Sequence, residues 1–97
     1  MANQQRNRTL QQARTTLGGA EVLASAREFF SRESGIYSAF LDKQGPTFVN
    51  LRGLGGEEIV VGVSDAPGGT AVTASSYMFD QQVARFLASL PPTAVTA

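Results

Sequence analysis

Glu57–Asp65, with the sequence EEIVVGVSD, is the stretch that decides the fold. It holds the densest run of β-branched residues in the chain, which are Ile59, Val60, Val61 and Val63. Branching at Cβ restricts χ1 and favours a pleated strand over a helix. We therefore predict the central strand of one small sheet. Ile59, Val61 and Val63 should face the helices, whereas Val60 and Gly62 should face away from them.

Three further strands are predicted around it, over residues 36–41, 47–51 and 70–77. The first two should be joined by a hairpin loop over 42–45, with Gly45 at positive φ and Pro46 opening the next strand. Pro67 and Gly68 have the pattern of a type II turn before the last strand. Connections this short favour an antiparallel meander.

Two amphipathic helices are predicted at the ends of this meander. Residues 20–33 carry one apolar stripe with a C-cap at Ser34–Gly35, and residues 81–90 carry another after a cap at Asp80. Both helices should cover one face of the sheet. A further short helix, over residues 9–17, is suggested by the spacing of its few apolar residues.

The predicted architecture is a single α+β domain, a four-stranded antiparallel meander with an N-terminal and a C-terminal helix packed on one face. The domain should span residues 19–92. Residues 1–18 are expected to form a polar arm, partly helical or disordered, and residues 93–97 a mobile tail.

Composition excludes more functions than it suggests. The chain has 97 residues, and its eight basic and eight acidic residues cancel. A neutral chain is a poor match for duplex DNA or an anionic membrane surface. With no cysteine and no histidine, disulfides, thiolate zinc sites and the commonest general base are all missing. The polar N-terminus and the absence of a long apolar run favour a cytoplasmic protein with no membrane partner.

The candidate chemical motifs have simpler explanations. The glycine-rich stretch 53–56 is followed by two carboxylates and a strand rather than by the helix N-terminus that a phosphate loop needs. Glu57 and Glu58 are adjacent on a strand and should point to opposite faces. The serines and threonines of 70–77 have no histidine to activate them. We therefore expect no enzyme, no cofactor and no metal site.

The leading hypothesis is a non-enzymatic protein-interaction module, and self-association is expected because the core is small and both sheet faces carry apolar residues. It would serve as a homodimeric adaptor, chaperone-like or assembly subunit. The candidate interface residues are Tyr37, Phe40, Phe48, Val49, Leu51 and Val60.

Two alternatives remain open. The chain could bind single-stranded nucleic acid through the sheet and its arginines, for which the candidate contacts are Arg6, Arg8, Arg14 and Arg52. It could instead hold a small molecule in a pocket formed with Tyr37, Tyr77, Arg52 and Arg85.

Residues 35–49, GIYSAFLDKQGPTFV, resemble the first hairpin of roadblock-type dimerisation domains. That fold inserts a helix between its second and third strands, for which this sequence leaves no room. The resemblance therefore implies no function for this chain.

Overall fold

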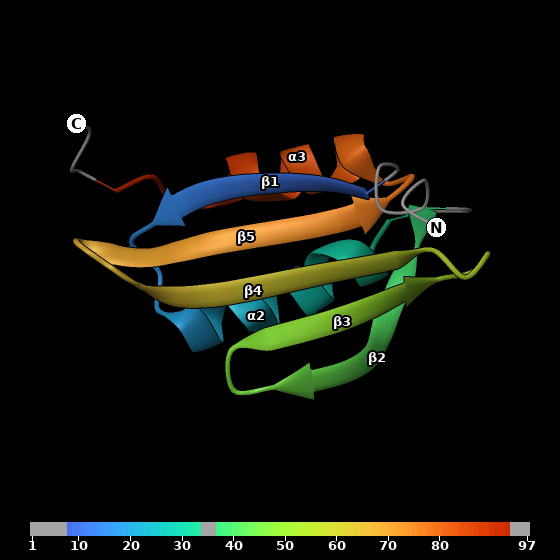
Figure 1. Ribbon diagram of the computed structural model, residues 1–97, viewed down its shortest axis with the longest axis horizontal. Helices are drawn as coiled ribbons and strands as arrows, with labels where there is room; N and C mark the ends of the chain where they lie inside the picture. Colours follow the sequence, from blue (N-terminus) through green and yellow to red (C-terminus); the bar gives the residue numbers. More distant parts are fainter. Residues whose placement is uncertain (1–7, 34–36, 94–97) are drawn as a thin grey trace.

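The computed structural model describes residues 8–33 and 37–93, and the valine-rich stretch lies at its centre (Figure 1). β4 (Glu58–Ala66) is the middle strand of a five-stranded antiparallel sheet with the order β1-β5-β4-β3-β2. Its neighbours are β5 (Gly69–Tyr77) and β3 (Phe48–Gly53). The two edges are β1 (Arg8–Thr15) and β2 (Ala39–Gly45). The prediction of a central strand is confirmed.

Both helices lie on the same face of this sheet (Figure 1). α2 (Gly19–Ser31) links β1 to β2 and packs against β4, β3 and β2. α3 (Asp80–Ser89) follows β5 and packs against β5 and β1. The α+β class and the one-sided helix layer are confirmed, but the sheet has five strands and not the predicted four.

The fifth strand is β1, and the helix predicted over residues 9–17 is wrong. β1 pairs with β5 in unbroken register from Arg8 opposite Tyr77 to Thr15 opposite Thr70. Ala13 packs against the core, Thr15 is buried, and the Gln11 side-chain amide donates to the Asp80 carbonyl at 3.0 Å. Tertiary pairing thus overrides a weak helical spacing of two leucines and an alanine.

The core lies between the helices and one face of the sheet. Ile59 and Val61 are fully buried there, and Val63 packs against the same cluster, as predicted for alternate residues of β4. The helices contribute Phe29, Phe30 and Phe86, whose ring centroids lie 5.2–5.5 Å apart. This aromatic contact joins α2 to α3 and closes the core between them.

The hairpin between β2 and β3 differs from its prediction. β2 continues to Gly45, and the turn is formed by Pro46 and Thr47, so Pro46 does not open a strand. Gly45 is not among the residues with positive φ, and the register shifts by one residue between Leu41 and Lys43. This bulge absorbs the extra residue, Asp42, that the prediction had placed in the loop.

Other turns and caps follow the sequence more closely. Gly68 has φ 80°, as a type II turn requires at this position. α3 begins at Asp80 itself, one residue earlier than predicted, and the Phe79 carbonyl accepts the hydrogen bond of Val83. α2 ends at Ser31 instead of residue 33, and its predicted cap at Ser34–Gly35 lies outside the described residues.

Candidate interaction surface

The face of the sheet away from the helices, here called the open face, is covered by no element among the described residues (Figure 1). The registers fix which side chains it carries, because residues directly opposite each other share a face. Gln12, Thr73, Gly62 and Phe48 form one row across β1, β5, β4 and β3. Leu10, Ser75, Val60 and Asn50 form the next row.

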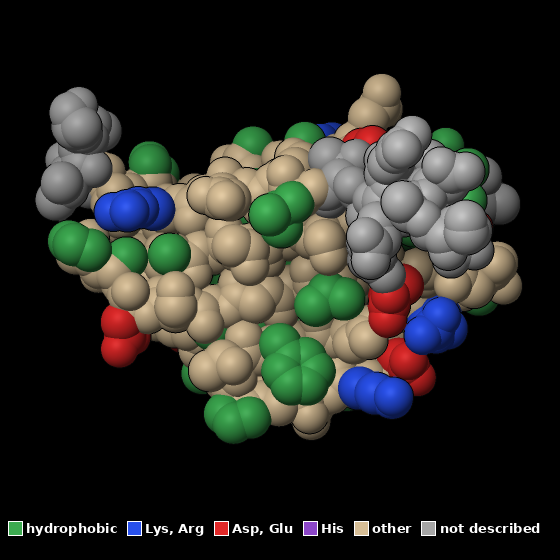
Figure 2. Space-filling view, in the orientation of Figure 1, with side chains coloured by type: hydrophobic (Ala, Val, Ile, Leu, Met, Phe, Trp, Pro, Cys, Tyr) green, Lys and Arg blue, Asp and Glu red, His purple; other side chains and the backbone are tan. Residues whose placement is uncertain are grey.

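Apart from Val60, small and polar residues make up the middle of the open face. Figure 2 shows hydrophobic side chains standing singly on this face and charged side chains lying toward its ends. Four large apolar residues on it are strongly exposed: Leu10 at 62%, Phe40 at 49%, Tyr77 at 41% and Phe48 at 38%. A face of this kind lets another backbone come close in the middle while it offers apolar anchors around it.

Phe48 owes its exposed position to two glycines. It lies opposite Gly45 on one neighbouring strand and opposite Gly62 on the other. A Cβ added to Gly45 would collide with the Phe48 ring. The ring is therefore held over residues without side chains and remains partly open to solvent, instead of being covered by cross-strand neighbours.

One end of the open face holds a compensated charge cluster. Arg52 Nη2 lies 3.2 Å from Asp42 Oδ2 and 3.7 Å from Glu58 Oε2, and its Nη1 donates to the Gly56 carbonyl at 3.1 Å. Asn50 Nδ2 donates to the same Glu58 oxygen at 2.8 Å. Two carboxylates thus neutralise Arg52, which makes it a weak contact for a phosphate group.

The predicted interface residues divide between the two faces. Phe40, Phe48 and Val60 lie on the open face, but Val49 and Leu51 face the helices and are 1% and 0% exposed. Their assignment to an interface is wrong, because neighbouring residues on a strand point to opposite faces. Tyr37 precedes the first residue of β2, and its ring centroid lies 5.8 Å from that of Phe79.

Sequence reasoning missed Leu10 and Tyr77 as candidates for this surface. Residues 10–15 show no alternation of apolar and polar residues, so no sequence signal would have placed Leu10 on the open face. Of the predicted nucleic-acid contacts, Arg14 is exposed on the open face and Arg8 belongs to β1. Arg6 lies outside the described residues.

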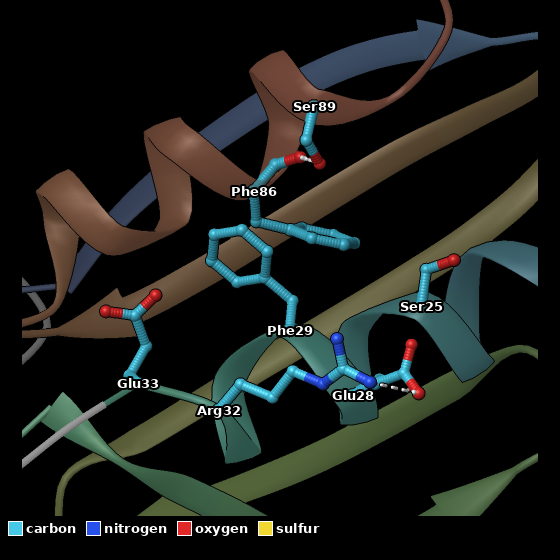
Figure 3. A pocket seen from close by; sticks show the side chains of 7 residues that line it. All are labelled: Ser25, Glu28, Phe29, Arg32, Glu33, Phe86 and Ser89. Atoms are coloured by element: carbon cyan, nitrogen blue, oxygen red, sulfur yellow. Dashed lines mark hydrogen bonds and ion pairs between the residues drawn. The ribbon is translucent and has the colours of Figure 1, made fainter.

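A groove between α2 and α3 is a second candidate site, on the opposite side of the molecule. It has a volume of about 330 Å³ and an aromatic floor of Phe29 and Phe86 (Figure 3). Arg32 Nη2 and Glu28 Oε2 pair at 3.2 Å on its rim, and Glu33 pairs with Arg85 at 3.7 Å. The volume suits a small ligand, but the charged rim groups already have partners within the chain.

The hydroxyl groups of β5 that face the helices have structural roles. Thr70 Oγ1 donates to the Leu17 carbonyl at 2.6 Å, and Ser76 Oγ donates to Asp80 Oδ1 at 3.1 Å. Over residues 8–33 and 37–93, no group of three or more acidic, cysteine or histidine side chains comes together in a way that could hold a metal ion. In those same ranges, no helix has the length and apolar character needed to cross a membrane.

Comparisons with known proteins identify no relative of this chain. No family model matches the sequence. No curated protein matches it either. The fold, too, finds no match among solved structures.

Proposed function

We propose that this chain is a non-enzymatic protein-interaction module that self-associates and presents its open face to a protein partner. It would act as an adaptor, chaperone-like or assembly subunit. The observation that carries the proposal is the open face itself, where exposed Leu10, Phe40, Phe48 and Tyr77 surround a middle of small residues. Large apolar side chains that stay exposed around small residues offer anchors to a protein partner.

The one-sided helix layer supports the same proposal. The helices cover one face of the sheet, and the core of the described residues lies on that face. Gly62 and Ser75 on the open face offer little side chain for packing, and no element in the described part of the chain covers them. A partner backbone or helix laid over them would contact Phe48 and Leu10 at its sides.

Photo-crosslinking tests where protein partners bind. Benzoyl-phenylalanine placed at Phe48 should give adducts of defined mass in extracts of the source cells. Leu54 is the matched control, because it is 71% exposed but lies in the turn between β3 and β4. Equal adducts from both positions, or none from either, would contradict the proposal.

Binding of single-stranded nucleic acid remains a second candidate, favoured by one observation. Arg14, Phe48 and Tyr77 share the open face, so a cation and stacking rings would meet a strand on the same side. Retention on oligonucleotides at low salt, lost in Arg14→Ala, would support this candidate. No retention at low salt would remove it.

A further inference from the structure

β1 is an edge strand without the features that protect β2. β2 carries a bulge after Leu41, a lysine at position 43 and a proline directly after its last residue. Bulges, lysines and prolines are the usual means by which edge strands avoid pairing with other chains. β1 has no bulge, lysine or proline and stays in regular register along its whole length, and its charged residues, Arg8 and Arg14, lie toward its two ends. The β2 edge is therefore protected against pairing with another chain, whereas the β1 edge is a regular strand.

The hydrogen bonds at the end of β1 reveal which of its backbone groups point outward. Thr16 donates to the Pro91 carbonyl at 3.2 Å, and Thr15 is bridged to Pro92 on the side away from β5. Backbone groups alternate sides along a strand, so the N–H and C=O of Leu10 and Gln12 also point away from β5. Within the described ranges, Pro91–Thr93 is the segment that pairs with this edge, and it does so only beyond residue 13.

We propose that β1 pairs antiparallel with β1 of a second copy, with Leu10 opposite Leu10. The two sheets would then form one continuous ten-stranded sheet with all four helices on one side. This inference rests on the self-association in the proposed function and specifies the contact that produces it. The open faces of both copies remain available and join into one surface for a further partner.

The register follows from the segment that already occupies part of the edge. In a two-fold antiparallel pair, residues whose backbone groups point outward must oppose one another. Centring the pair on Gln12 would put Arg8 opposite Thr16, whose N–H is bonded to Pro91. Centring it on Gln11 would put Arg8 opposite Arg14, where Thr93 lies in register. Centring it on Leu10 pairs Arg8 with Gln12 and leaves Pro91–Thr93 in place, and it is the longest pairing of the described residues of β1 that does so.

The position of α3 agrees with this register. The Gln11 amide reaches the Asp80 carbonyl at the start of α3, and the chain leaves α3 beside Thr16. α3 therefore runs along β1 on the helix side of the sheet, with its first residue bonded to Gln11 and its end beside Thr16 (Figure 1). The helices of the two copies would start near the axis and run apart, while each Leu10, 62% exposed in one chain, covers the other.

Disulfide trapping tests the register, and the chain has no native cysteine to interfere. In Leu10→Cys the two Cα atoms would lie about 5.5 Å apart, within reach of a disulfide. Gln12→Cys is the matched control on the same face, because its copies would be about 13 Å apart along the strands. We expect mild oxidation to link Leu10→Cys into dimers and to leave Gln12→Cys monomeric. Equal linking of both variants, or of neither, overturns the register.

A proline at position 12 tests the edge without depending on a disulfide. The Gln12 N–H points away from β5, so Gln12→Pro removes a donor that only the second copy uses. We expect this variant to keep its far-ultraviolet circular dichroism and to sediment as a monomer. A variant that is folded and sediments like the wild type would overturn the proposal.

The wild type separates failure of this inference from failure of the proposed function. Self-association of the wild type without linking of Leu10→Cys would mean that copies meet elsewhere, so the function stands and the edge contact falls. A wild type that is monomeric throughout, yet crosslinks to another protein through Phe48, would also overturn the edge contact. A wild type that is monomeric and gives no adduct at Phe48 contradicts both the edge contact and the proposed function.

Discussion

Met78 holds a backbone conformation that its side chain does not favour. Among the described residues it is the non-glycine residue with positive φ, at 73°, in the connection from β5 to α3. Its side chain is 67% exposed, so packing does not compensate for the strain. The conformation is imposed by the turn that brings Phe79 back into the core, where it is 3% exposed.

Met78→Gly should therefore stabilise the fold. Glycine accepts this φ without strain, and we expect the free energy of unfolding to rise by about 0.5–1 kcal/mol after allowance for the greater freedom of glycine in the unfolded chain. Urea unfolding followed by circular dichroism measures it. Tyr77→Gly is the control and should be destabilising, since Tyr77 belongs to the regular strand. A loss of stability in Met78→Gly would show that the exposed side chain matters to the fold.

The start of β5 approaches the end of β1 so closely that only glycine fits at position 69. Gly69 has φ 157°, and a Cβ added there would collide with the Thr15 carbonyl oxygen and approach the Thr16 Cα. Thr70 Oγ1 holds the two strand ends together through its hydrogen bond to the Leu17 carbonyl. The turn after β4 is thus packed against the connection between β1 and α2. We expect these two segments to lose their structure together when the protein unfolds.

Gly69→Ala should cost more stability than an alanine at another positive-φ glycine. Gly56, with φ 91° and open space around its Cβ position, is the matched control, and Gly56→Ala should cost about 1 kcal/mol from backbone strain alone. Gly69→Ala adds a backbone collision, which we expect to cost about 1–3 kcal/mol more. Equal unfolding midpoints for the two variants in urea would show that β1 can move away from β5 at no cost.

The strands differ in how far their sequences determine them. β4 could be predicted because its buried residues are all large and β-branched, and its neighbours followed from their turns. β1 could not, because its helix-facing positions are Gln11, Ala13 and Thr15, which have no apolar alternation to signal a strand. Only its pairing with β5 makes it one.

The candidate surface was predicted in part for a related reason. Phe48 and Val49 are adjacent and both apolar, so composition does not indicate which of them faces the helices. Which of them faces the helices depends on the bulge between Leu41 and Lys43 and on the turn at Pro46. The sequence does not predict either feature. A shift of one residue exchanges the two faces of a strand, so the sequence alone does not distinguish Val49 and Leu51 from the residues of the open face.

The molecule is a sheet with both helices on one face, and its candidate contact surfaces are the opposite face and the β1 edge. The helices complete one face, the bulged β2 closes one edge, and residues 91–93 cover the end of the other. Within residues 8–33 and 37–93, no element covers the open face or the Leu10–Gln12 portion of β1. Pairing two copies along β1 would close that edge and enlarge the open face, which is the arrangement expected of an adaptor that joins a dimer to a partner.

Amide-resolved hydrogen exchange at several protein concentrations tests this account most directly. At low concentration the amides of Gln11 and Ala13, which point toward β5, should exchange slowly, whereas those of Leu10 and Gln12 should exchange fast. As the concentration rises, the account predicts that exchange slows at Leu10 and Gln12 together. Exchange at these two amides that stays fast at every concentration would contradict it.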